Sequence, residues 1–311
     1  MTPVATVTYP AVLRSQDMVF TLFGDYLLER ERPVWTGALI TLLGQLGMSP
    51  MAVRTALSRM SRKGWLAGSR RGNRSWYALA ARGRRLLSEG RERIYHPPEG
   101  SAWDGQWTLV TYTVPESRRR VRDRLRSRLT WLGMGPVASG VWITPHDVRG
   151  AVEEIAAALR LTRHVEVFRG QHLGFTDTAA LVRQCWDLDA LNRRYAAFHE
   201  RWRGDLDACR RCALRGGRGA PNEPCSSPAD CFRRRFLLVH EYRELVGNDP
   251  FLPPSLLPSD WKGRESAALF QSYHEVLTGP AVRYVEEVCR AGEPEHTPPV
   301  RQSRDLHSTR A

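Results

Sequence analysis

Four cysteines in the C-terminal half of the chain have a spacing suited to a metal ion: Cys209, Cys212, Cys225 and Cys231. Four thiolates supply the tetrahedral shell that zinc prefers, and the first pair has the two-residue spacing common in zinc ribbons. The segment RGGRGAPNEP between the pairs is rich in glycine and proline, so we expect a loop that brings the pairs together. Two other interpretations stay open: the thiols bind an iron–sulfur cluster or sense redox state, or they bind nothing.

A second group of residues has the character of a nucleic-acid-binding surface. Between Pro33 and Ser88 the chain has no Asp or Glu, although ten lysines and arginines fall in that segment. A solvated protein surface normally mixes both signs of charge, so we expect this segment to face phosphates. The whole chain of 311 residues carries a formal net charge of +13, which also favours polyanionic partners.

The basic residues fall on one face of a predicted helix and on a predicted hairpin. Within residues 50–63, Val53, Leu57 and Met60 recur at helical spacing and should face the core. The opposite face and the hairpin tip carry the candidate DNA-binding residues Arg54, Thr55, Ser58, Arg59, Arg62, Arg70, Arg71, Asn73 and Arg74. Arginine can donate to both acceptors of guanine, and small hydroxyls let a helix approach the major groove. The alternatives are a merely solvated face and a module that docks protein.

The elements expected around these residues follow the order of a winged helix-turn-helix. Ser15 and Thr36 can cap two helices, because their side chains can accept from free backbone N–H groups. Ser49 followed by Pro50 is a strong start signal for a third helix. Two strands around a glycine turn then follow, at residues 65–69 and 74–79.

The rest of the chain predicts two further regions, so the expected fold class is α+β multidomain. After a proline-containing linker at residues 96–100, strands and helices alternate as β-α-β-β-α-β, the ferredoxin-like order. The predicted domains are a winged helix-turn-helix over 16–96, a ferredoxin-like middle domain for dimerisation or effector binding over 103–170, and a mostly helical C-terminal domain with the cysteine-rich loop over 177–291. Residues 1–14 and 293–311 are expected to be flexible tails.

Composition and motifs disfavour several classes of protein. No apolar run approaches the roughly 20 residues that span a bilayer, and the first residues lack the layout of a signal peptide. We therefore expect a cytoplasmic protein with no membrane partner. P-loop, Rossmann and nucleophile-elbow patterns are absent in a suitable context, so the sequence predicts no catalytic residues and no enzyme activity.

Several multi-residue motifs resemble one known family. The segments VFTLFGDYLLER, PVWTGALITLLGQLGMSPMAVRTALSRMSRKGWL, WDGQWTLVTYTVPESRR and FLLVHEYRELVGNDPFLPPSLLPSDWKG are similar to the PaaX-type repressors of phenylacetate catabolism. The resemblance covers residues 17–288 in the same order. It implies a homodimeric repressor that binds double-stranded operator DNA and leaves it when an aryl-acyl-CoA thioester, typically phenylacetyl-CoA, binds.

The resemblance also implies roles for particular residues. Operator reading would fall to the segment from Ala52 to Arg62, and the HEYR motif makes His240 and Arg243 candidates for effector binding. A CoA ester would suit a positively charged chain, because arginine binds phosphates well. No cofactor is required by the resemblance, and the cysteine loop with its candidate structural zinc departs from the family pattern.

Two rival functions stay open. The middle domain resembles the ferredoxin-like fold of the CRISPR adaptation nucleases, which hold a metal on an aspartate at the end of the first strand. Here the matching segment TYTVP, at residues 111–115, has no carboxylate before Glu116, so we expect the fold without cleavage. The second rival is a metal- or redox-responsive regulator that uses the four cysteines as its sensor.

Overall fold

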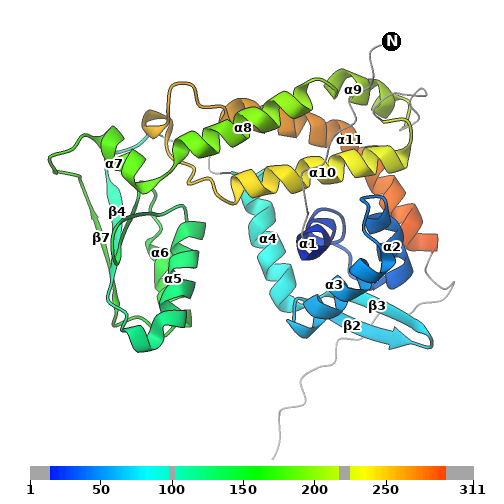
Figure 1. Ribbon diagram of the computed structural model, residues 1–311, viewed down its shortest axis with the longest axis horizontal. Helices are drawn as coiled ribbons and strands as arrows, with labels where there is room; N and C mark the ends of the chain where they lie inside the picture. The colour runs from blue at the N-terminus through cyan, green and yellow to red at the C-terminus, as the bar shows by residue number, and fades with distance from the viewer. Residues whose placement is uncertain (1–14, 98–101, 217–224, 292–311) are drawn as a thin grey trace, which may run out of the picture. The chain divides into compact units, whose positions relative to one another are not determined.

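The computed structural model describes residues 15–97, 102–216 and 225–291 of the chain (Figure 1). These residues form two compact units, which are described separately below. The described part of unit 1 comprises residues 15–91, 205–216, 225–240 and 272–291. The described part of unit 2 comprises residues 92–97, 102–204 and 241–271. Both units therefore contain helices from the predicted C-terminal domain, and the three-domain division stays a prediction.

Unit 1 contains a small antiparallel sheet, in the order β1-β3-β2, together with several helices. Its elements from the first part of the chain are α1 (Ser15–Tyr26), β1 (Val34–Trp35), α2 (Thr36–Gly44), α3 (Pro50–Arg62), β2 (Leu66–Arg71), β3 (Arg74–Leu79) and most of α4 (Ala81–Tyr95). Later parts of the chain add α9 (Leu206–Leu214), the first part of α10 (Pro228–Val246) and the second part of α11 (Gly263–Ala291).

Local sequence signals explain where the central helix and hairpin of unit 1 begin and end. The Ser49 hydroxyl accepts a hydrogen bond from the Ala52 N–H at 3.2 Å, and Pro50 occupies the first turn of α3. Gly64, at φ +69°, ends the helix in a left-handed conformation. Gly72, at φ +59°, forms the turn between β2 and β3. These features agree with the sequence-based expectations.

The predicted cap of α2 is wrong. Trp35 is the residue at the N-cap position of this helix, and it makes no capping hydrogen bond through its side chain. Thr36 is instead the first helical residue, and its hydroxyl donates to the carbonyl oxygen of Ser75 at 2.8 Å. The backbone pairing of β1 with β3 fixes the chain just before α2, so the threonine hydroxyl fastens the helix to the sheet rather than capping it.

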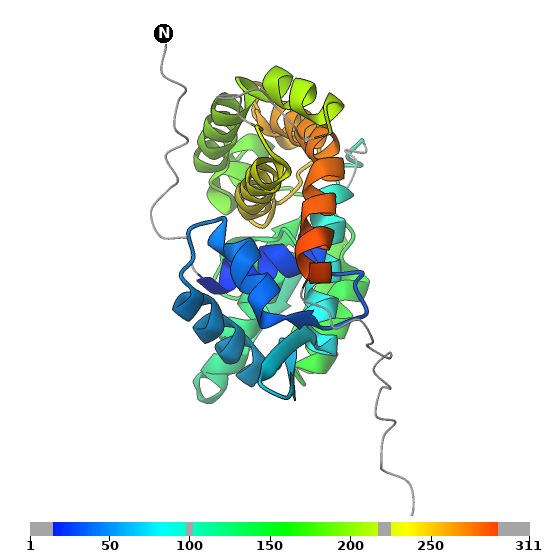
Figure 2. The same ribbon diagram turned by 90° about the vertical axis from the view of Figure 1, so that its right-hand side faces the viewer.

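The core of unit 1 joins residues that are far apart in the sequence. Buried side chains of α1, α2 and α3 pack against Phe232 and Phe236 of α10 and against Ala281 and Val285 of α11. Figure 2 shows the C-terminal part of α11 beside the blue helices of the N-terminal region. The first helices therefore do not bury their apolar faces by themselves.

Unit 2 contains an antiparallel sheet of four strands in the order β5-β6-β4-β7. The elements are β4 (Trp107–Tyr112), η1 (Glu116–Arg118), α5 (Arg119–Trp131), β5 (Gly135–Ala138), β6 (Val141–Thr144), α6 (Arg149–Ala158) and β7 (Val165–Gly170). Their succession is the β-α-β-β-α-β order expected from the sequence. Val110 of β4 lies opposite both Trp142 and Val167, and these residues pack with α5 and α6 in one core.

The helical part of unit 2 consists of α7 (Thr178–Cys185), α8 (Leu188–Arg203), η2 (Pro254–Leu256) and parts of α10 and α11. Asp177 and Asp187 begin α7 and α8, because their carboxylates accept from Ala180 N at 2.6 Å and from Ala190 N at 2.9 Å. Inside the unit, the Tyr195 hydroxyl donates to Asp249 Oδ2 at 2.7 Å.

Two further expectations concern the ends of the chain and the membrane. The predicted flexible tails at 1–14 and 293–311 lie outside the described residues. Of the helices that the structure describes, none has the length and apolar character required to cross a bilayer.

Candidate nucleic-acid interface

Helix α3 separates an apolar face from a basic one. Val53, Leu57 and Met60 have no exposed side-chain surface and pack in the core of unit 1. The exposed face carries the predicted reading residues Arg54, Thr55, Ser58, Arg59 and Arg62. Ala52 is half-buried on the first turn. The predicted face thus lies in solvent, where a DNA duplex could reach it.

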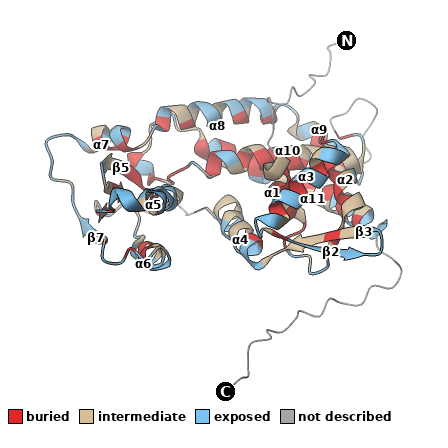
Figure 3. Ribbon diagram, turned by 60° about the horizontal axis from the view of Figure 1, so that its bottom comes forward, coloured by how far each residue is buried: buried red, intermediate tan, exposed pale blue. Residues whose placement is uncertain are grey.

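The hairpin β2-β3 supplies the second part of the candidate interface. Every residue of β2 after Leu66 is exposed, as the pale blue strand in Figure 3 shows. The four predicted tip residues Arg70, Arg71, Asn73 and Arg74 are all exposed. The guanidinium of Arg74 stacks on the ring of Trp35, 4.9 Å from its centroid, so this side chain is partly ordered before any ligand binds.

Close backbone packing fixes the hairpin against α4. A Cβ atom at Gly83 would lie 2.2 Å from the carbonyl oxygen of Trp65, so only glycine fits at this point of the helix. One residue earlier, the guanidinium of Arg82 lies over the Trp65 ring, 3.9 Å from its centroid. Arg82 therefore joins α4 to the base of the hairpin through its charge and its stem.

One exposed residue of α3 was missed by the sequence-based reasoning. Met51 has 72% of its surface exposed, although methionine is usually buried. It precedes Thr55 and Ser58 at helical spacing, so it extends the same face toward the start of α3. The helical spacing of Met51 from Thr55 and Ser58 could have predicted this exposure. The residue was overlooked because only polar side chains were considered as DNA contacts.

The four candidate metal ligands come together in unit 1, but mostly not on a loop. Cys209 and Cys212 lie on α9, Cys231 lies on α10, and only Cys225 lies outside a helix. The expectation of a cysteine-rich loop is therefore wrong for three of the four. Residues 206–214 contain alanine, leucine and arginine, which favour a helix, and a spacing of three residues places both thiols on one face.

The four thiols form a compact buried cluster. All four side chains are fully buried and unbridged. The sulfur of Cys225 lies 3.4 Å from that of Cys209, and Cys212 and Cys231 have the same separation. Hydrogen bonds from Cys209 and Cys231 lower the pKa of Cys225 to about 4. The same hydrogen bond to Cys225, together with burial, raises the pKa of the Cys209 thiol.

The two candidate effector residues have different surroundings. His240 is 3% exposed; its Nδ1 lies 2.8 Å from the Thr21 hydroxyl, and its ring stacks on Phe236. These contacts are typical of a structural histidine in a core. Arg243 is partly exposed. Their role in effector binding stays a prediction.

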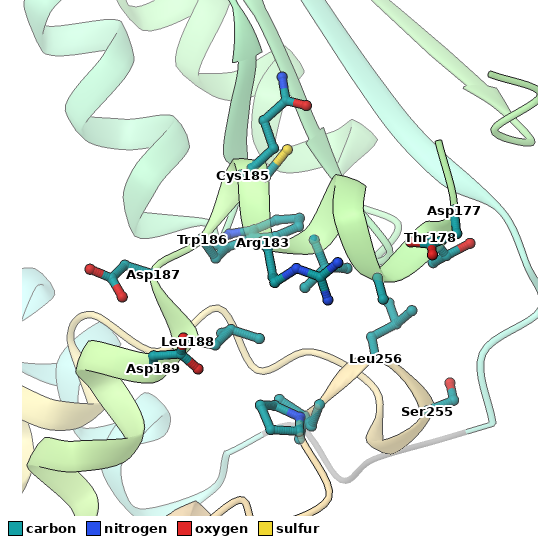
Figure 4. A pocket seen from close by; sticks show the side chains of 15 residues that line it. Asp177, Thr178, Arg183, Cys185, Trp186, Asp187, Leu188, Asp189, Ser255 and Leu256 are labelled. Atoms are coloured by element: carbon teal, nitrogen blue, oxygen red, sulfur yellow. The ribbon is translucent and has the colours of Figure 1, made fainter. Parts of the chain in front are cut away.

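Unit 2 contains a pocket of about 1000 Å³ (Figure 4). It is lined by α7, by the first residues of α8 and by the segment around η2, with Arg183, Trp186 and Leu256 among its walls. Asp177 and Asp187 at this pocket already serve as helix caps. Neither His240 nor Arg243 lines it, so the pocket does not coincide with the predicted effector residues.

Comparison with known proteins places the chain in a family. Three family models match consecutive segments: "PaaX-like protein" over residues 14–83, "PaaX protein central Cas2-like domain" over 100–182, and "PaaX-like protein C-terminal domain" over 186–287. The Transcriptional repressor PaaX of Escherichia coli (strain K12) is 31% identical over 273 residues, which cover 87% of this chain and 82% of that protein. The chain belongs to the PaaX family.

A solved structure shares the fold of this PaaX-family chain. The uncharacterized protein Rv0674 from Mycobacterium tuberculosis superposes with a TM-score of 0.53 at 23% identity. The match covers 89% of this chain and 99% of that one. At this identity the likeness concerns the fold alone.

The Cas2-like match directs attention to the carboxylate that follows β4. Glu116 begins η1, and its carboxylate pairs with Arg122 at 2.8 Å and with Arg119 at 3.7 Å. Among the described residues of this PaaX-family chain, the one group of three or more side chains close enough to share a metal ion is Cys212, Cys225 and Cys231. Glu116 does not belong to that group, and its carboxylate is engaged in the two ion pairs within unit 2.

Proposed function

We propose that this chain is a transcriptional repressor that binds operator DNA through a winged helix-turn-helix formed by α1 to α3 and the hairpin β2-β3. The observation that carries the proposal is the exposed face of α3, where Arg54, Arg59 and Arg62 lie opposite a fully buried apolar face. Such a helix suits the major groove, because arginine can donate twice to guanine. Membership of the PaaX family, with a relative named as a transcriptional repressor, supports the same function.

The hairpin β2-β3, which is the wing of the proposed DNA-binding module, supports a second contact with the duplex. Arg70 is ordered by a hydrogen bond from its Nε to the Gly72 carbonyl at 3.2 Å, and Arg74 is ordered by its stacking on Trp35. In the proposal these two side chains hold the phosphate backbone beside the groove that α3 enters. Phosphate contacts position the protein, and contacts from α3 read the base edges.

The middle of the chain is proposed to have a ferredoxin-like fold without nuclease activity. The succession β-α-β-β-α-β and the sheet order β5-β6-β4-β7 support this fold. The pairing of Glu116 with Arg122 and Arg119 supports a structural role for that carboxylate. Incubation of the purified chain with Mg²⁺ or Mn²⁺ and nucleic acid should give no cleavage, and metal-dependent cleavage would favour the nuclease.

The proposal includes a homodimer and an acyl-CoA effector of the phenylacetyl-CoA type. The resemblance of the sequence motifs to the PaaX-type repressors implies both, and the net charge of +13 suits a ligand with several phosphates. His240 contacts Thr21 of α1, and helix α1 packs in the same core as α3. A ligand that displaced His240 would therefore also affect the proposed DNA-binding helices. Arg243 is proposed as a further effector contact. Light scattering on the full chain should give twice the monomer mass.

A gel-shift titration tests the function and the effector together. The full chain is bound to a duplex from its own upstream region, and acyl-CoA thioesters and the corresponding free acids are added in turn. Release by a CoA thioester, and not by the free acid, is the expected result. Absence of any complex at low ionic strength would contradict the repressor. Release by chelator or oxidant alone would favour a metal- or redox-responsive regulator.

A further inference from the structure

The four-cysteine cluster of unit 1 lies outside the proposed DNA-binding face and has no part in it. We propose that Cys209, Cys212, Cys225 and Cys231 bind one structural Zn²⁺ ion, which fastens α9 to the start of α10. The proposal rests on the convergence of the four sulfurs, on the chemistry of the ligands and on the way in which α9 is buried.

The sulfur positions are close to those of a tetrahedral zinc site. A regular tetrahedron with Zn–S bonds of about 2.3 Å has S···S edges of about 3.8 Å. The sulfurs of Cys212, Cys225 and Cys231 all lie within 4.8 Å of one another, and Cys209 lies 3.4 Å from Cys225. Cys209 lies outside the group of three sulfurs that are mutually within 4.8 Å, so an ion held by all four requires the Cys209 side chain to move toward Cys212 and Cys231.

The ligand set favours zinc among the common metal ions. Four sulfurs with no carboxylate or imidazole among them select zinc or iron–sulfur chemistry, because both prefer soft thiolates in tetrahedral geometry. Zn²⁺ with four thiolates carries a net charge of −2. Arg234, which donates to Asp205 at 2.5 Å, lies near enough to Cys209 and Cys225 to offset part of that charge.

The burial of α9 is the strongest reason to expect a metal. The buried side chains of this nine-residue helix are Cys209 and Cys212, whereas Leu214 is 88% exposed. A helix this short is marginal by itself and normally depends on an apolar face that packs on its neighbours. Leu206, Ala208 and Ala213 are only half-buried, so the two thiols form the buried part of the inward face, and metal–sulfur bonds would strengthen an attachment that apolar packing supplies only in part.

Two disulfides are the main alternative for these thiols. A disulfide bond is about 2.05 Å long, whereas the two closest pairs of sulfurs are separated by 3.4 Å. Disulfides would require only two separate pairs, yet Cys225 also lies near Cys212 and Cys231. Two independent disulfides would not require the Cys212–Cys231 pair to lie beside the Cys209–Cys225 pair. One metal ion bound by all four sulfurs explains why the two pairs lie together.

The position of the cluster indicates a structural ion. Cys231 is followed directly by Phe232, which packs on Tyr26 of α1 with ring centroids 5.3 Å apart. Phe232 also belongs to the core that holds α3. Loss of the ion should therefore loosen α9 and the start of α10, and lower the melting temperature of the chain.

Metal analysis of the full chain, freed of any affinity tag and purified without chelator, tests the proposal. We expect about one zinc per chain by mass spectrometry of the elements. A thiol reagent should release this zinc in step with modification of four thiols, and denaturation without reductant should expose all six. Exchange with Co²⁺ should give the intense charge-transfer absorption of a tetrahedral thiolate site.

Matched substitutions separate the proposed ligands from other buried cysteines. Cys212→Ser should lose the zinc and lower the melting temperature. Cys185→Ser should keep it, because Cys185 is buried in a different cluster of unit 2. If Cys212→Ser does not fold, the zinc content and cobalt spectrum of the unmodified chain still decide the question.

Four results would overturn the proposal. They are a zinc-free folded chain with six free thiols, iron with acid-labile sulfide, two disulfides that leave two free thiols, and zinc that survives in a folded Cys212→Ser variant. None of them depends on DNA binding, so this proposal and the proposed function can fail separately.

Discussion

Asp25 of α1 and Arg235 of α10 form a buried ion pair, each with 4% of its side chain exposed, although 210 residues separate them. A second bond joins Arg235 Nη2 to Asp25 Oδ1 at 3.1 Å, and the guanidinium also lies over the ring of Tyr26. The pair fastens the helices near the N-terminus to α10. The stability of the proposed DNA-binding module therefore depends on residues far along the chain.

Removal of one partner of this pair should destabilise unit 1 strongly. Asp25→Ala leaves the Arg235 charge buried without its carboxylate, and we expect the free energy of unfolding to fall by about 3 to 5 kcal/mol. Glu29→Ala is the control, because it breaks an exposed ion pair with Arg91 and should cost less than about 1 kcal/mol. Urea titration of both variants gives the comparison, and equal losses would contradict the assignment.

The reading role of Arg59 predicts a change in sequence preference. Arg59→Ala should weaken binding to the preferred operator by about 1 to 3 kcal/mol for each subunit of the proposed dimer and relax selection at one base position under each subunit. Arg163→Ala removes the same charge from an exposed turn of unit 2 and should leave the selection unchanged. Competition binding with single-base operator variants measures both effects. An unaltered preference in Arg59→Ala would show that another residue reads that base.

The wing predicts a different kind of loss. Arg74→Ala should weaken binding about equally for all sequences and make the slope of log K against log[salt] shallower by about 2, because each subunit of the proposed dimer loses one phosphate contact. Trp35→Leu should give a smaller loss, since it leaves the charge but removes the ring on which Arg74 stacks. Fluorescence anisotropy over a range of salt concentrations distinguishes this result from a change of specificity.

The free energy of unfolding should depend on pH through the protonation of Asp249 in unit 2. Burial raises the pKa of this carboxyl above its ordinary value of 3.8, despite the hydrogen bond from Tyr195. A folded chain with a raised carboxyl pKa holds extra protons, so the free energy of unfolding falls as the pH rises from near 4. Asp249→Asn should remove this part of the pH dependence, while the exposed Asp260→Asn should not. Parallel curves for wild type and Asp249→Asn would contradict the prediction.

Local features of the fold could be predicted because they depend on neighbouring residues. The Ser49-Pro50 signal, the glycine turn at Gly72 and the alternation of strands and helices from β4 to β7 are all explicit in the sequence. The exposed basic face of α3 followed from its spacing alone, since the side opposite Val53 and Leu57 must face solvent.

Features that depend on distant contacts could not be predicted in the same way. The packing of Phe232 and Ala281 on the first three helices joins segments more than a hundred residues apart. The helical placement of Cys209 and Cys212 was obscured by the glycine-rich segment that follows them. The bond from Thr36 to Ser75 depends on the pairing of β1 with β3, which residue type does not reveal.

The salt dependence of DNA binding tests the central claim most directly. For the full chain on an operator duplex, a dimer that neutralises about 8 phosphates should give a slope of log K against log[salt] of about −7. The variant with Arg54, Arg59 and Arg62 all changed to alanine should bind far more weakly, with a clearly shallower slope. A slope near zero for the unmodified chain, or an unchanged slope and affinity in the triple variant, would contradict DNA binding through α3.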